Sequence, residues 1–209
     1  AGVAAWMHGV YKEPLTDEAV AELASFRIPM VATIVVFESY ALLGQGEREA
    51  TPLEREMVPE ETLRAFDEVP QENEAVKVFA PFLEGLRANR GTWRDNVRRL
   101  RAAGVTILAG SDTQTGVFPG PGLHRELHLL TEAGLTPPEA IRAATLDPAR
   151  FLEVTEDPDF GVVAEGKRAD LLLVDGDPTD DLHALARIRA VILRGIPLER
   201  RAIGSDPPR

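Results

Sequence analysis

The segment GVTILAGSDTQTGVFPGPGLHRELH, residues 104–128, decides the predicted fold. Residues 105–109 form a short apolar run with β-strand character, and Ser111 and Asp112 follow directly after it. A loop rich in glycine and proline comes next, and a helix is expected from Leu123. In a barrel of parallel strands covered by helices, the C-terminal strand ends form the floor of the active site. The segment therefore predicts a strand, loop and helix with Asp112 at the mouth of a pocket.

The start of the chain has the same organisation. Residues 2–7 form an apolar run that ends at His8, and Thr16 is suited to cap a helix that stops before Pro29. Residues 30–37, MVATIVVF, are apolar and rich in β-branched side chains, which is typical of a parallel strand buried on both faces. The order strand, loop, helix, strand places His8 at a strand end, as it does Asp112.

The middle of the chain is predicted to be mainly helical. A weak helical pattern covers residues 52–67, and a longer one covers residues 72–103 with interruptions expected near Pro81 and Gly91. The many arginines of the longer pattern are interpreted as a solvated face. Three more helical pieces are expected at residues 123–133, 137–145 and 148–154, with Thr136 as an N-cap and Gly134 just after a helix end.

The last part of the chain changes to the two-residue period of β-strands. Strands are expected at residues 161–163, 169–175, 189–194 and near 197–199. A few antiparallel strands after strand and helix units predict a second, smaller domain. The tail from residue 204 is expected to be disordered.

Composition limits the classes of function. The 209 residues are 44% hydrophobic and carry a formal net charge of −11, which disfavours nucleic acid and anionic membranes as partners and favours small molecules. There are no cysteines, so any metal must be held by histidine and carboxylate groups. The longest apolar run is about half of the ~20 residues that a membrane span needs. The lack of cysteine and of a signal segment favours the cytoplasm, and the start at Ala1 without methionine suggests a fragment.

Several of these segments together resemble one enzyme family. The chain is similar to the C-terminal half of enzymes of the amidohydrolase superfamily, in its imidazolonepropionase-like and prolidase-like branch. The resemblance is carried by AGSDT at 109–113, LHRELHLLTEAGLTPPEAIRAATLDPARFL at 123–152, GVVAEGKRADLLLVDGDPTDDL at 161–182 and IRAVILRG at 188–195.

The resemblance implies an α/β fold: part of a TIM-like (β/α) barrel, strands six to eight, followed by the C-terminal strands of a composite β-sandwich. The barrel part would cover residues 1–155 and the sandwich part 156–203. It also implies a metal site, in which His8 matches the sixth-strand histidine and Asp112 the eighth-strand aspartate. The H-x-H pair and the strand-end lysine of the family do not occur in this sequence.

The implied activity is hydrolysis of a carbon–nitrogen bond in an amide, a cyclic amide or a dipeptide-like substrate. One or two divalent ions, Zn²⁺ by expectation, would activate water and polarise the carbonyl group. Asp112 would move the proton from the water to the leaving nitrogen, while His8 would hold metal. Thr113 and His124 are expected to contact substrate. Because most ligands are missing, the chain alone is expected to bind metal poorly and to be inactive.

Two other interpretations stay open. One is that the chain is a non-catalytic structural or interaction module, with exposed strand edges that favour homo-oligomers. The other is a zincin-type protease built on His124 and His128 of HRELH, although the glutamate stands at the wrong position of that motif. Glu126 is expected to pair with Arg125 or Arg142 without a catalytic role, and His183 to lie in the sandwich, far from the site.

Overall fold

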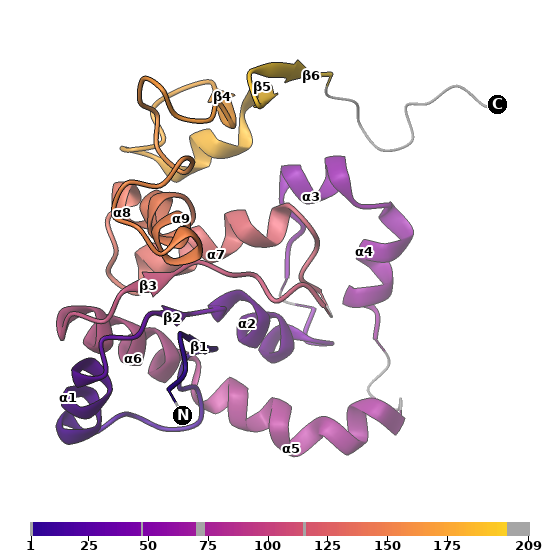
Figure 1. The fold of residues 1–209 in the computed structure, drawn as a ribbon. Coiled ribbons are helices and arrows are strands. Elements are labelled where there is room, and N and C mark those ends of the chain that lie inside the picture. Colours follow the sequence, from indigo (N-terminus) through magenta and orange to yellow (C-terminus); the bar gives the residue numbers. More distant parts are fainter. Residues whose placement is uncertain (1, 47, 70–73, 115, 200–209) are drawn as a thin grey trace.

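The computed structural model describes residues 2–46, 48–69, 74–114 and 116–199. Figure 1 shows a small parallel sheet between α6 and α7, and an antiparallel sheet beyond α8 and α9 at the top of the view. The helices are α1 (Asp17–Ser25), α2 (Ile34–Leu42), α3 (Pro52–Met57), α4 (Glu60–Asp67), α5 (Glu74–Ala88), α6 (Arg90–Ala102), α7 (Pro121–Glu132), α8 (Pro137–Ala143) and α9 (Leu146–Glu153), with a 3₁₀ turn η1 (Leu182–Ala186).

The parallel sheet contains β1 (Trp6–Met7), β2 (Met30–Val31) and β3 (Ile107–Leu108), in the order β1-β2-β3. Trp6 pairs with Met30 and Met30 with Ile107, so β2 is the central strand. Because all three strands run in one direction, the residues that follow them meet at a single edge of the sheet. That edge carries both predicted site residues.

The segment after β2 differs from the prediction. Residues 30–37 were expected to be one strand, but the strand ends at Val31 and α2 begins at Ile34. Ile34 to Phe37 are all buried, so the apolar run lacks the polar face that would distinguish a helix from a buried strand. The β-branched residues are accommodated because α2 is enclosed by α5, α6 and α7.

The other helices follow the predicted pattern with shifted boundaries. The Thr16 hydroxyl accepts from Ala19 N–H as the N-cap of α1, and Thr136 with Glu139 forms a capping box on α8. Pro81 lies inside α5 without ending it, and the break comes at Asn89. The arginines of α6 are not simply solvated, because Arg99 pairs with Asp17 and Arg101 with Glu139.

The antiparallel sheet contains β4 (Leu171–Val174), β5 (Ile188–Leu193) and β6 (Ile196–Leu198). The expected strand at 161–163 is not formed; these residues are in bends and coil. The domain boundaries predicted from the sequence remain an expectation, and the expected disordered tail lies outside the described residues.

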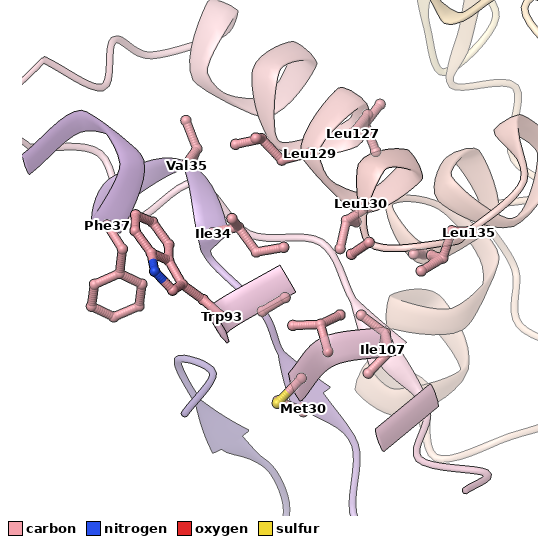
Figure 2. Close-up of a cluster of buried hydrophobic side chains, with 14 of the residues drawn as sticks. Met30, Ile34, Val35, Phe37, Trp93, Ile107, Leu127, Leu129, Leu130 and Leu135 are labelled. Atoms are coloured by element: carbon pink, nitrogen blue, oxygen red, sulfur yellow. The ribbon is translucent and has the colours of Figure 1, made fainter. Parts of the chain in front are cut away.

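The main core lies between α2, α6, α7 and the parallel sheet. Figure 2 shows its side chains converging from these elements, among them Met30, Ile34, Trp93, Leu129 and Leu130. Met30, Leu129 and Leu130 have no exposed surface. Within the described residues, the helices are all too short or too polar to cross a membrane.

Candidate functional site

His8 and Asp112 come together at the edge where the parallel strands end. His8 directly follows β1, Asp112 lies four residues beyond β3, and His8 Nδ1 is 4.0 Å from Asp112 Oδ2. Their side chains are 42% and 36% exposed, so both are open to solvent and to a ligand. The two residues are about a hundred positions apart in the chain, and their approach follows from the parallel pairing of β1 and β3 on either side of β2.

The His8 ring is held by two residues at the start of α2. Its Nδ1 lies 2.8 Å from the hydroxyl of Thr33, the N-cap residue of that helix. The Phe37 ring, one turn further along, meets the imidazole edge to face at 5.9 Å between centroids. Phe37 is itself fixed by stacking on Tyr11 and by an edge contact with Trp93. The imidazole is therefore oriented by a rigid aromatic support.

The Asp112 carboxylate is held through the loop that follows it. Gln114 Nε2 donates to Asp112 Oδ2 at 2.8 Å, and Gln114 Oε1 accepts from the Tyr40 hydroxyl at 2.7 Å. Tyr40 lies on α2. The Gln114 side chain therefore links the carboxylate to the same helix that supports His8.

One face of α2 thus supports both site residues. Thr33, Phe37 and Tyr40 stand at positions i, i+4 and i+7, which project from the same side of a helix. The sequence prediction missed all three as site residues because it assigned this segment to a strand. The i, i+4, i+7 spacing was present in the sequence, but it becomes visible only once the segment is recognised as a helix.

Three residues at this edge have left-handed backbone conformations. The φ angles are 69° for His8, 48° for Thr33 and 46° for Asp112. Such a conformation is costly for a residue with a side chain, and most of all for a β-branched threonine. Strain of this kind is often found at functional sites, where the surrounding structure enforces it. All three strands of the parallel sheet are followed by one such residue.

The donor chemistry of the pair fits part of a zinc site. Imidazole nitrogen and carboxylate oxygen are both ligands of Zn²⁺. His8 Nδ1 lies near both the Thr33 hydroxyl and Asp112 Oδ2, so the Thr33 contact fixes the ring that faces the carboxylate, as hydrogen bonds orient ligand histidines in metal sites. A catalytic zinc takes three protein ligands. Over the described ranges, no group of three histidine or acidic side chains is placed to hold a metal ion.

The expected substrate-binding residues lie in different surroundings. Thr113 is exposed, and its hydroxyl lies 3.3 Å from that of Ser111 beside Asp112. His124, in the first turn of α7, lines a cavity of about 900 Å³ bounded by α2, α3, α7 and η1. Burial lowers the pKa of His124, which favours the neutral form of its ring. His8 and Asp112 do not line this cavity.

The remaining residues of HRELH differ from the prediction. Glu126 pairs with neither Arg125 nor Arg142: its side chain is completely buried, and its Oε2 accepts from the backbone N–H of Val35 at 2.8 Å. Burial raises the pKa of Glu126 to about 8. Arg125 instead binds Glu38 of α2 through two nitrogens at 2.8 Å.

His183 was expected in the sandwich, far from the site. It lies on η1, which packs on α7, and its ring is 4.3 Å from that of His128 between centroids. Burial, followed by the nearby His183, lowers the pKa of His128. These rings pack between η1 and α7, away from His8 and Asp112.

Comparison with known proteins agrees with the resemblance seen in the sequence. The chain is 35% identical over 109 residues to imidazolonepropionase of Deinococcus deserti, which covers 52% of this chain and 27% of that enzyme. It is 35% identical over 89 residues to ochratoxinase of Aspergillus niger, covering 43% of this chain and 18% of the relative. The chain therefore matches about a quarter or less of the length of these relatives.

Solved structures show the same relationship at the level of the fold. A protein from Bifidobacterium longum assigned as a prolidase superposes with a TM-score of 0.66 and 28% identity, over 95% of this chain and 42% of that one. A Xaa-Pro dipeptidase superposes with a TM-score of 0.62 at 22% identity, over 94% of this chain and 40% of the dipeptidase. The model of the amidohydrolase family matches residues 29–197, most of the chain including Asp112. The chain belongs to the amidohydrolase family.

Proposed function

We propose that this chain provides the His8 and Asp112 part of the active site of a metal-dependent hydrolase that cleaves a carbon–nitrogen bond. The observation that carries the proposal is the 4.0 Å approach of these side chains at the ends of parallel strands in a member of the amidohydrolase family. The parallel strands would be strands six to eight of a barrel. The remaining ligands would come from residues outside this chain.

The roles of the two residues follow from their chemistry. His8, oriented by the Thr33 hydroxyl, would hold a divalent cation through a ring nitrogen. A bound Zn²⁺ would supply Lewis acidity to the substrate carbonyl. Asp112 would take the proton of the attacking water and return it to the leaving nitrogen. Gln114, anchored by Tyr40, would keep the carboxylate in place during both transfers.

The substrate class is an amide, a cyclic amide or a dipeptide-like compound. Its support is that the similar proteins include imidazolonepropionases and proteins described as prolidases. Thr113 beside Asp112 would contact the substrate. His124 would take part only through the cavity that it lines, because His8 and Asp112 do not line that cavity.

The test is hydrolysis of a panel of Xaa-Pro dipeptides, N-acyl amino acids and cyclic amides, with zinc present. The 209-residue chain alone should be inactive, and a longer protein that contains it should be active. In the longer protein, D112N should lower kcat/KM by about 10²–10⁴-fold, the usual contribution of a positioned acid or base. Stoichiometric zinc and turnover in the isolated chain, or an active D112N variant, would contradict the proposal.

A second candidate, the non-catalytic interaction module, is favoured by one observation. On one face of the antiparallel sheet, Leu172, Leu193, Ile196 and Leu198 are 44%, 50%, 66% and 47% exposed. Apolar side chains gathered in this way are typical of an interaction surface. If this is the function, the chain should form oligomers by sedimentation, and L193E with I196E should leave monomers.

The zincin-type alternative requires a glutamate that reaches the metal-bound water. The Glu126 side chain is instead buried against the start of α2. A direct comparison separates it from the main proposal. H128A should leave metal binding in the longer protein unchanged, whereas D112N should weaken it. The opposite result would favour the protease.

A further inference from the structure

The start of α2 lacks the cap that its sequence would provide. A threonine at the N-cap position usually accepts a hydrogen bond from the N–H of the second or third helical residue. Thr33 makes no such bond, and its backbone is left-handed. Its hydroxyl lies 2.8 Å from His8 Nδ1 instead. The first N–H groups of α2 therefore need another acceptor.

Glu126 is that acceptor. Its Oε2 accepts from the N–H of Val35, the second residue of α2, at 2.8 Å, although the two residues are 91 positions apart. A completely buried carboxyl group is costly unless it makes such a bond. The backbone groups near this carboxyl group all belong to the start of α2, at Thr33, Ile34 and Val35.

The capping bond made by Glu126 leaves the Thr33 hydroxyl available to His8. Gly110 helps to define the same position, because a Cβ atom there would lie 3.3 Å from Thr33 Cγ2 and 2.4 Å from Val31 Cγ1. Further along α2, Phe37 supports the His8 ring, and Tyr40 holds Gln114. The placement of α2 therefore determines the contacts of both His8 and Asp112.

We propose that Glu126 is a positioning residue of the candidate site: by capping α2 from α7, it releases the Thr33 hydroxyl to orient the His8 imidazole. Glu126 touches neither substrate nor the reacting atoms. It acts through Val35 and Thr33, and its loss would let Thr33 return to the ordinary capping conformation. The role of His8 as a ligand rests on the proposed function, whereas its orientation by Glu126 does not.

The experiment compares four variants of the full chain without metal, all at the same pH. E126D shortens the reach of the carboxylate, E126Q keeps an acceptor oxygen, and T33V removes the hydroxyl. E54A is the matched control, because Glu54 is also a buried capping glutamate, but it caps its own helix α3 at Thr51 and not α2. Two signals are read by NMR: hydrogen exchange of the Val35 amide, and the ¹⁵N shifts of the His8 ring nitrogens, which report the tautomer.

E126D should speed the exchange of Val35 and shift the His8 tautomer ratio about fivefold, the equivalent of one hydrogen bond of about 1 kcal/mol, toward the T33V value. E126Q should retain both wild-type signals, and E54A should leave His8 unchanged. The proposal is wrong if E126D speeds the exchange of the Val35 amide while the His8 tautomer ratio stays as in wild type. It is also wrong if E126D leaves the Val35 exchange unchanged, or if E54A changes the His8 tautomer ratio as much as E126D does. Because no metal is present, these outcomes do not depend on catalysis.

Discussion

The two sheets of this protein differ in what supports them. The parallel sheet has strands of only two residues, yet Met30 and Leu108 are almost fully buried by the surrounding helices. The antiparallel sheet has longer strands, but Leu193 and Ile196 are exposed. Each short strand is also followed, within four residues, by a residue with a left-handed backbone, and two of these residues form the candidate site. The comparison teaches that the precision of a site depends on helix packing around the strand ends and not on the length of strand pairing.

The largest difference is expected for truncation of one apolar side chain in each sheet. M30A empties a position with no exposed surface and should lower the free energy of unfolding by about 2–5 kcal/mol. L193A removes a half-exposed side chain and should cost about 1 kcal/mol or less. Urea denaturation followed by circular dichroism measures both. Equal losses would show that the two sheets do not differ in support.

Substitution of one glycine in each sheet region distinguishes the cost of a packing clash from the cost of backbone strain. G110A should cost about 1–3 kcal/mol, because the new Cβ would lie 2.4 Å from Val31 Cγ1. G195A should cost about 1–2 kcal/mol for another reason: it has open space, but φ is +81°. The V31A substitution should offset part of the G110A loss in the double variant and none of the G195A loss. Strictly additive losses for G110A and V31A would contradict the packing explanation.

Glu126, the buried residue that caps α2, should make the free energy of unfolding depend on pH. Burial raises the folded-state pKa of Glu126 from an ordinary value of 4.5 to about 8. The folded state therefore binds the Glu126 proton more tightly than the unfolded state does. The stability that this binding contributes is complete below pH 4.5 and is lost as the pH rises to about 8. The slope should reach at most about 1.4 kcal/mol per pH unit. E126Q should flatten this slope in urea denaturation; an unchanged slope would show that another group causes it.

The antiparallel sheet should respond to pH with the opposite sign and with the smallest effect. The backbone N–H of Arg194 lowers the pKa of Asp170, which is exposed to solvent. The folded state therefore favours the ionised carboxylate, and the stability that this gives is lost as the pH falls through the lowered pKa. D170N should remove a small acid-induced loss below about pH 4. A loss that persists in D170N would come from other carboxylates.

The sequence predicted the end of β2 wrongly, at Phe37, but predicted the ends of β1 and β3 well. His8 and Asp112 were placed there from short apolar runs and the rules of strand, loop and helix units. The caps of α1 and α8 and the turn at Gly134 were also predictable, since Thr16, Thr136 and Gly134 act locally. These features depend on neighbours within a few residues.

The sequence could not predict α2, and with it most of the support of the site. MVATIVVF reads as a strand because a helix buried on all sides has no polar face. Its start is capped by Glu126, 91 residues away, so the stabilising contact is tertiary. Glu126 was interpreted as a surface partner of arginine because nothing near it in sequence indicates that it is buried.

The most direct test of the central claim is a zinc soak of crystals of this chain, with the ion located by anomalous scattering. We predict a zinc peak in contact with both the His8 imidazole and the Asp112 carboxylate, even if a high zinc concentration is needed because the chain contributes only two ligands. Zinc bound only at His124, His128 or His183, or side chains of His8 and Asp112 that face apart, would contradict the claim that the two residues share one cation.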